Sequence, residues 1–378
     1  MKRLTTLLST LVGMMSTNVF AEYGLNMTEG VTSISRDIYD LHMMVFWICV
    51  IIAVLVFGAM FYSVFAHRQS KGAVAAQFHE STKAEFLWTA IPVIILVGMA
   101  IPASKTLIDL EDTSKAEMTI KVTGHQWKWQ YYYPKEDITL ISNLAKTSKD
   151  SHEADIKNLN NETYETGAVN VDNYLLEVDN RLVLPVDTSI RFLITSNDVI
   201  HNWWVPAFGV KQDANPGFIN DAWAQIDKIG TYRGQCAELC GKDHGFMPIV
   251  VEVKSKADYA IWVSEQQAAA AAATESATKT WSKADLMAKG KTVYDTSCAG
   301  CHKADGSGGG PFPAIKGSAI ANGPAADHMS IVLNGKGIMS PFRKLLGDSD
   351  LAAVITYERN AFGNTGSVVQ PSDVKSAR

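Results

Sequence analysis

The sequence predicts a multi-domain chain: a two-helix transmembrane hairpin, then an all-β sandwich, then a small all-α domain. Three observations carry this prediction. Two long apolar segments lie within the first 110 residues, short alternating β-branched runs follow from about residue 117, and an alanine-rich tract precedes a final segment of helical patterning. At 378 residues, the chain is also long for one compact domain.

Residues 1–21 have the layout of a secretory signal peptide, with Lys2 and Arg3, a short apolar stretch and small residues at the expected cleavage position. The alternative is a short first membrane anchor. The hairpin then occupies residues 22–110, with apolar segments over about 43–65 and 86–108 that are each long enough to cross a bilayer. The connecting loop carries a cluster of basic residues, His67, Arg68, Lys71 and Lys83. By the positive-inside rule this loop is cytoplasmic, so everything after residue 110 faces outward.

Residues 111–263 contain short β-branched runs, such as 118–122 and 249–253, separated by turn sequences, which favours a sandwich or barrel. A polar stretch over about 135–170 is expected to be a poorly ordered loop insertion. Residues 264–280 are an alanine-rich linker that is expected to start as a helix. The small helical unit covers 281–363, and residues 364–378 are expected to form a loose tail.

Charge and cysteine placement limit the possible functions. The net charge of −5 argues against a nucleic-acid partner, because such a protein needs a basic face. Cys49 is isolated in an apolar run, whereas the other four cysteines form two local pairs. Pairs this close in sequence tie little of the chain together as disulfides, so cofactor binding is the better interpretation.

The first pair belongs to a metal-binding pattern. Cys236, Cys240, His244 and Met247 are spaced four, four and three residues apart, and His201 offers a further imidazole from an earlier run. Thiolate, imidazole and thioether together select copper, and two thiolates with two imidazoles can bridge a pair of copper ions. The alternatives are a zinc site with two cysteines and two histidines, or a disulfide. Zinc leaves Met247 unexplained, and a disulfide leaves both His201 and Met247 unexplained.

The second pair lies in Cys298-Ala299-Gly300-Cys301-His302, the attachment motif of c-type haem. The two thiols would add to the haem vinyl groups, and His302 would become the proximal iron ligand. A short redox or zinc element is the alternative.

Residues 281–363 resemble a class I cytochrome c. The resemblance implies a methionine as second axial ligand, on a loop before the last helix, and Met339 fits this position. Met329, in a run that looks helical, and His328 are the alternatives. Pro313 is expected to hold the imidazole of His302 through its carbonyl group.

Residues 30–263 resemble subunit II of cytochrome c oxidase. The resemblance is carried by the two apolar segments, the cysteine motif and the strings 124–129, 198–206 and 211–217. It implies a cupredoxin-like β-domain that holds a dinuclear copper centre, CuA. In the family pattern Cys236 and Cys240 bridge both coppers, and His201 and His244 are terminal ligands. Met247 is a weak ligand to one copper, and the backbone carbonyl of Glu238 completes the other.

Three further roles follow from the same resemblance. Trp127 matches the aromatic residue where electrons are taken up, although a packing role would suit it equally. The Glu238 carboxylate matches a ligand to a magnesium ion shared with subunit I. Glu85 matches an acidic residue at a proton-uptake site; the alternative is a favourable charge near a helix N-terminus.

The whole chain therefore resembles subunit II of a haem–copper cytochrome c oxidase with a cytochrome c fused at its C-terminus. The resemblance implies electron flow from an external donor, such as a soluble cytochrome c, to haem c, then to copper, then to the oxygen-reducing subunit I of a proton-pumping oxidase. Subunits I and III and membrane lipid are the expected partners. The expected location is the bacterial inner membrane, with both cofactor domains in the periplasm. The rival functions are a copper carrier or assembly factor, and an electron carrier for another terminal reductase.

Overall fold

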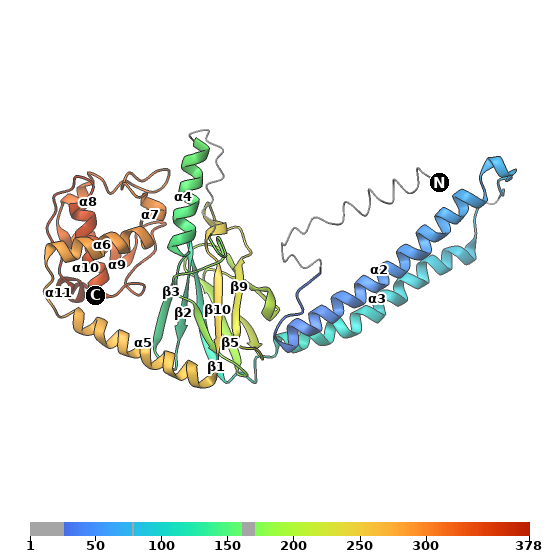
Figure 1. The fold of residues 1–378 in the computed structure, drawn as a ribbon, viewed down its shortest axis with the longest axis horizontal. Helices are drawn as coiled ribbons and strands as arrows, with labels where there is room; N and C mark the ends of the chain where they lie inside the picture. Colours follow the sequence, from blue (N-terminus) through green and yellow to red (C-terminus); the bar gives the residue numbers. More distant parts are fainter. Residues whose placement is uncertain (1–25, 78, 161–170) are drawn as a thin grey trace, which may run out of the picture.

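The structure, a computed structural model, describes residues 26–77, 79–160 and 171–378 (Figure 1). The expected signal peptide over residues 1–21 lies outside the described residues. Two long helices, α2 (Ser33–Ala66) and α3 (Thr82–Glu111), run side by side and are joined by a loop with the short helix η1 (Gln69–Lys71). Both are long and apolar enough to cross a membrane, and neither apolar stretch is buried against the rest of the chain. The helices are longer than the apolar segments because Thr32 and Ser81 cap them upstream.

The base of the hairpin is fixed to the β-domain by backbone and side-chain contacts. The hydroxyl of Thr32 donates to the carbonyl oxygen of Phe208 at 2.9 Å. The guanidinium of Arg36 lies 2.7 Å from the carboxylate of Asp227. At the end of α3, the indole N–H of Trp223 donates to the carbonyl oxygen of Asp109 at 3.0 Å. The β-domain is therefore held in a defined position at one end of the membrane helices.

Within the described residues, ten strands form two packed sheets, so the predicted sandwich is confirmed. The first sheet, in the order β3-β2-β1-β5-β8, consists of β1 (Met118–His125), β2 (Lys128–Tyr133), β3 (Ile138–Ser142), β5 (Ser189–Ser196) and β8 (Asn220–Gln225). The second, in the order β4-β10-β9-β6-β7, consists of β4 (Leu182–Pro185), β6 (His201–Val205), β7 (Val210–Ala214), β9 (Gly230–Cys236) and β10 (Ile249–Lys254). Short 3-10 helices, η2 (Pro206–Phe208) and η3 (His244–Phe246), lie in the connections.

The core between the sheets is rich in aromatic side chains. Trp129, Phe192 and Trp203 are fully buried, and the rings of Phe192 and Trp203 lie 4.8 Å apart. Large rings fill the space between sheets efficiently and bury much apolar surface. The strands that end at the metal-binding loops are therefore rigidly supported.

The described part of the polar stretch, up to residue 160, is more ordered than expected; residues 161–170 lie outside the described residues. Its beginning forms β3, which pairs with β2 at the sheet edge, and α4 (Lys146–Asn160) follows. Ser148 and Ser151 of α4 are buried, so at least one face of this helix is packed. The prediction failed here because β3 has few alternating residues and lies between polar neighbours, so its apolar pattern is too short to stand out from the surrounding polar sequence.

The alanine-rich linker is one continuous helix, α5 (Lys256–Ser276), rather than a tract that is helical only at its start. Ser255 caps it through a hydrogen bond from the backbone N–H of Asp258, and alanine and glutamine favour helix throughout. Figure 1 shows α5 leading from the sandwich to the C-terminal domain.

The C-terminal domain consists of α6 (Lys283–Ser297), α7 (Ala299–His302), α8 (Ala319–Asn322), α9 (Ala325–Asn334), α10 (Asp348–Asn360) and α11 (Pro371–Ala377). Helices α6 and α10 pack closely at Gly290, where a Cβ atom would lie 2.1 Å from the carbonyl oxygen of Ala353. The expected loose tail is instead ordered: α11 packs on the domain, and Val374 is fully buried. Its short length and polar composition hid the two buried residues, Pro371 and Val374, that anchor it.

Candidate metal centres

Five predicted ligand side chains meet at one end of the sandwich. They come from the beginning of β6 (His201), the end of β9 (Cys236), the loop after it (Cys240), η3 (His244) and the residue after η3 (Met247). Cys236 Sγ lies 3.9 Å from both Cys240 Sγ and His201 Nδ1. Cys240 Sγ lies 3.5 Å from both His244 Nδ1 and Met247 Sδ. The structure therefore brings together residues that are up to 46 positions apart in the sequence.

Glu238 faces this cluster through its backbone and not through its carboxylate. Its carbonyl oxygen lies 3.3 Å from Cys236 Sγ, whereas the residue as a whole is exposed. The carbonyl is therefore available to the cluster.

The donor set fits a copper pair. Both thiols are free, and Cys236 and Cys240 are both buried. The hydrogen bond from Cys240, together with His201, lowers the pKa of Cys236 to about 3, whereas the hydrogen bond to Cys236 and burial raise the pKa of Cys240. The opposite shifts show that the two thiols cannot both ionise without help. A bound metal ion would supply the positive charge that allows both to be thiolates. The thioether of Met247 beside Cys240 favours copper over zinc.

Asp198 positions His201, and sequence reasoning missed this role. The carboxylate of Asp198 lies 2.9 Å from Nε2 of His201 and accepts a hydrogen bond from the backbone N–H of Gln126 at 2.7 Å. This contact leaves Nδ1 of His201 facing Cys236. On the other side of the ring, a Cβ atom at Gly124 would lie 2.7 Å from Cδ2 of His201. The available signal was the spacing of Asp198 three residues before the histidine at the beginning of a strand.

Trp127 is hydrogen-bonded to the loop that carries Cys240. Its indole N–H donates to the carbonyl oxygen of Cys240 at 3.1 Å, and the side-chain amide of Gln126 donates to the same oxygen at 2.9 Å. Trp127 is half-buried, in contrast to Trp129, which belongs to the core. The ring is therefore partly exposed to solvent and at the same time hydrogen-bonded to the backbone of the predicted ligand Cys240.

The haem-attachment motif follows α6 and forms α7. Cys298 is buried, and burial raises the pKa of its thiol well above the usual range. Nδ1 of His302 lies 2.8 Å from the carbonyl oxygen of Pro313, which is the contact that the sequence led us to expect. Because this contact occupies Nδ1, Nε2 of His302 is the nitrogen left for iron.

The three candidates for the second axial ligand differ in their surroundings. Met329 lies on α9 and is buried in the helical core. His328 is also buried on α9, where its Nε2 lies 2.9 Å from the carboxylate of Glu358. Met339 lies on the loop between α9 and α10, half-buried against the same core. The loop position of Met339 is the one that the cytochrome resemblance implies.

Glu85 lies in the first turn of α3, where it is exposed. Its backbone carbonyl accepts a hydrogen bond from the hydroxyl of Thr89 at 2.9 Å. This placement agrees with either of the two roles considered for it.

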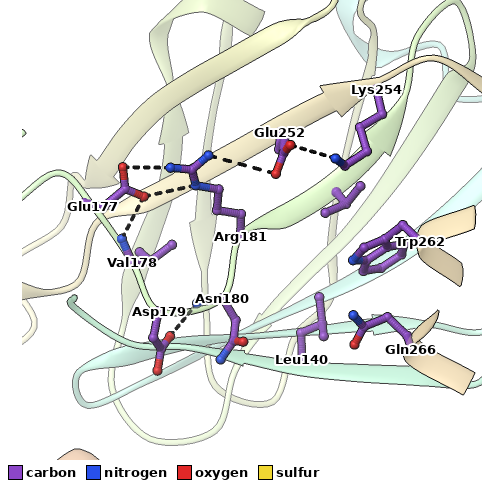
Figure 2. Close-up of a pocket in the computed structure, with 11 residues that line it drawn as sticks. Leu140, Glu177, Val178, Asp179, Asn180, Arg181, Glu252, Lys254, Trp262 and Gln266 are labelled. Atoms are coloured by element: carbon purple, nitrogen blue, oxygen red, sulfur yellow. Dashed lines mark hydrogen bonds and ion pairs between the residues drawn. The ribbon is translucent and has the colours of Figure 1, made fainter. Parts of the chain in front are cut away.

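A cavity of about 500 Å³ lies elsewhere on the β-domain, between the segment 177–181, β10 and α5 (Figure 2). Its wall carries alternating charges: Arg181 pairs with Glu177 at 3.1 Å and approaches Glu252 at 4.0 Å, and Lys254 pairs with Glu252 at 2.8 Å. These charges neutralise one another, and none of the lining residues is a predicted ligand. The chemistry lies in the loops and not in this cavity.

Family models match three parts of the chain. The periplasmic domain of cytochrome c oxidase subunit II matches residues 118–254, and the transmembrane domain of the same subunit matches residues 21–106. Residues 285–357 match subunit III of cbb3-type cytochrome c oxidase.

Relatives support the same assignment over the first two domains. A probable cytochrome c oxidase subunit 2 of Rickettsia prowazekii is 39% identical over 231 residues, 61% of this chain and 68% of the relative. Cytochrome c oxidase subunit 2 of Arabidopsis thaliana is 38% identical over 243 residues, 64% of this chain and 89% of the relative. The crystal structure of the periplasmic domain of subunit II of cytochrome oxidase of Bradyrhizobium japonicum is 40% identical, with a TM-score of 0.33; the match covers 40% of this chain and 95% of that one. The chain belongs to the family of cytochrome c oxidase subunit II, and it carries a cytochrome c domain at its C-terminus.

Proposed function

We propose that the chain accepts electrons at a covalently bound haem c and passes them through a dinuclear copper centre to the oxygen-reducing subunit I of a proton-pumping terminal oxidase. The observation that carries this proposal is the convergence of two thiols, two imidazoles and a thioether on one loop cluster. Soft donors of this kind favour copper, and a bound copper pair would supply one-electron redox chemistry.

The proposed ligands of the copper pair are His201, Cys236, Cys240, His244 and Met247, together with the backbone carbonyl of Glu238. Strand ends and Asp198 hold these groups in place, which limits their movement when charge changes. The proposed haem ligands are the thiols of Cys298 and Cys301 for attachment, with His302 and Met339 on the iron.

The remaining assignments are extensions of the same proposal. The Glu238 carboxylate would share a magnesium ion with subunit I, and Glu85 would lie at a proton-uptake site. Subunit III and an external donor such as a soluble cytochrome c complete the set of partners. The basic loop between α2 and α3 would lie in the cytoplasm and both cofactor domains in the periplasm of a bacterium.

Purification of the intact complex tests the proposal. We expect haem c and a pair of copper ions on this chain, in addition to the copper of subunit I, and an electron paramagnetic resonance spectrum in which one unpaired electron is split by two copper nuclei. Splitting by a single copper nucleus, or zinc in place of copper, would contradict the assignment. A Cys236→Ser variant should lose the shared-electron spectrum, whereas a Cys49→Ser variant should keep it, because Cys49 lies in α2 away from the cluster.

A further inference from the structure

We propose that Lys242 is a positioning residue. It holds the haem-attachment motif (298–302) of the chain's own C-terminal domain, here called the haem domain, against the segment 237–247 that follows β9, here called the copper loop, and α4 provides a second contact of the same clamp. This inference rests on the proposed function, because it assigns the surface through which the two centres communicate. It identifies the partner of the Trp127 surface as the fused domain.

Lys242 joins the two candidate centres directly. It lies two residues after Cys240, and its ammonium group donates a hydrogen bond of 2.6 Å to the carbonyl oxygen of Gly300, between Cys298 and Cys301. The same ammonium group lies 5.6 Å from the ring of Trp127 and 5.9 Å from the ring of Phe312. A single cation thus contacts one aromatic ring from each domain and a backbone oxygen of the haem motif.

Helix α4 makes a second contact with the same end of the haem domain. Nζ of Lys149 donates to the carbonyl oxygen of Asp295, in the last turn of α6, at 2.6 Å. The carbonyl groups at a helix C-terminus attract cations. One turn further along the same face, α4 packs on η3, with the rings of His152 and Phe246 4.6 Å apart. The polar insertion therefore bridges the two domains.

Two more contacts close the interface around these lysines. Lys128 is almost fully buried, and its ammonium group lies 4.9 Å from the ring of Phe342 in the haem domain. Ile141 of the edge strand β3 packs against the hydrophobic core of the haem domain. The contact covers a sheet edge that would otherwise be open to solvent.

The contacts define the character of this surface. Three lysines of the copper domain and its insertion meet carbonyl oxygens and aromatic rings of the haem domain, and none of these three contacts is an ion pair. The carboxylate near Lys242 is that of its neighbour Asp243, 3.8 Å away on the same loop. The helical linker alone would raise only the effective concentration of the haem domain near the copper domain. These contacts also fix the orientation of the two domains relative to each other.

Lysine variants in the purified, fully loaded complex test the inference. The rate of electron transfer from photoreduced haem to copper should fall on the order of tenfold in Lys242→Met, the loss of about one charge-assisted hydrogen bond. Lys242→Arg should restore the rate, because arginine can donate to the same carbonyl. The matched control is Lys211→Met, since Lys211 lies over the ring of Trp204 at 5.7 Å in the same domain but contacts no residue of the haem domain in the structure described. The copper spectrum should be unchanged in all three variants.

A distance measurement supplies a readout that does not depend on electron transfer. Spin labels at Gln225→Cys on β8 and Lys316→Cys in the haem domain, both exposed, are introduced in a Cys49→Ser background. Pulsed electron paramagnetic resonance should give a narrow distance distribution in the otherwise native chain and a broad one when Lys242→Met and Lys149→Met are combined. Equal widths would overturn the clamp.

The outcomes separate this inference from the proposed function. If haem and copper exchange no electron in the native complex, the proposed function fails. If they do, and Lys242→Met transfers electrons as fast as Lys211→Met while the combined Lys242→Met and Lys149→Met chain keeps the native distance distribution, only the clamp is wrong.

Discussion

The indole nitrogen of Trp127 donates a 3.1 Å hydrogen bond to the carbonyl oxygen of Cys240. This contact connects a half-buried aromatic ring, which faces the haem domain through Lys242, to the backbone of a proposed bridging ligand. The same oxygen accepts a second hydrogen bond from Gln126, so the loop that carries Cys240 is fixed from the side of β1 and β2. Under the proposed function, an electron that enters at this ring would reach Cys240 over one hydrogen bond and a few covalent bonds.

Replacing Trp127 with phenylalanine should slow electron uptake by the copper centre on the order of tenfold, since the ring remains while the hydrogen bond to Cys240 is lost. Stopped-flow or flash reduction of the complex measures this rate. Trp204→Phe is the matched control, because the ring of Trp204 on β6 also lies under a lysine, Lys211, at 5.7 Å. Equal rates in the two variants would give Trp127 a packing role only.

Asp198→Asn should weaken copper binding roughly 10- to 100-fold, the usual cost of removing the group that orients a ligating histidine. The carboxylate of Asp198 holds Nε2 of His201 at 2.9 Å and thereby directs Nδ1 toward Cys236. Competition with a copper chelator measures the affinity. In Asp213→Asn the affinity should stay native, because Asp213 bonds to Asn202 on the neighbouring strands and not to a ligand; a parallel loss there would show that the effect is general.

Met339→Leu should open one coordination position on the haem iron, so that the reduced domain binds carbon monoxide and its reduction potential falls. Met329→Leu conserves volume in the helical core and should change neither property. Absorption spectra with and without carbon monoxide, together with a redox titration, distinguish the two methionines. Carbon monoxide binding in the Met329 variant alone would reverse the assignment.

Glu177→Gln should lower the free energy of unfolding by about 1–2 kcal/mol at neutral pH. Burial raises the pKa of Glu177, but hydrogen bonds from Arg181 and Arg233 outweigh it and set the pKa below the usual 4.5. Because the pKa of Glu177 is lower in the folded chain than in the unfolded chain, its stabilising effect is fully present at a pH above the unfolded-state pKa. The effect is lost as the pH falls through the folded-state pKa.

Thermal unfolding of the full chain, from neutral pH to below the folded-state pKa of Glu177, checks the prediction. The difference in stability between the native and Glu177→Gln chains should vanish at the lowest pH. The exposed pair of Glu275 and Lys279 provides the control, since Glu275→Gln should change stability by well under 1 kcal/mol. A difference that persists unchanged at the lowest pH would mean that Glu177 acts by packing.

The sequence was informative where chemistry depends on local spacing. Cys236, Cys240, His244 and Met247 lie within one short motif, as do Cys298, Cys301 and His302, and the structure places each set together. The membrane hairpin and the sandwich were predictable because their apolar periods extend over many residues.

The parts that could not be predicted depend on contacts between distant segments. Nothing in the local sequence of Lys149 or Lys242 indicates that each donates to a carbonyl more than 50 residues away. The helix α4 reads as a polar loop because its partners are distant in the sequence, Phe246 in the same domain and Asp295 in the C-terminal domain. Helix α11 is anchored by its two buried residues, Pro371 and Val374. Both helices are therefore stabilised by tertiary packing, although their amino-acid composition does not favour helix.

The most direct test of the central claim is the concentration dependence of electron transfer from haem to copper in the purified complex. After a light pulse reduces the haem, we predict that the haem is reoxidised as the copper centre is reduced, at a rate independent of protein concentration, because both centres lie in one chain. A rate proportional to protein concentration, or no reduction of copper after the pulse, would contradict the account.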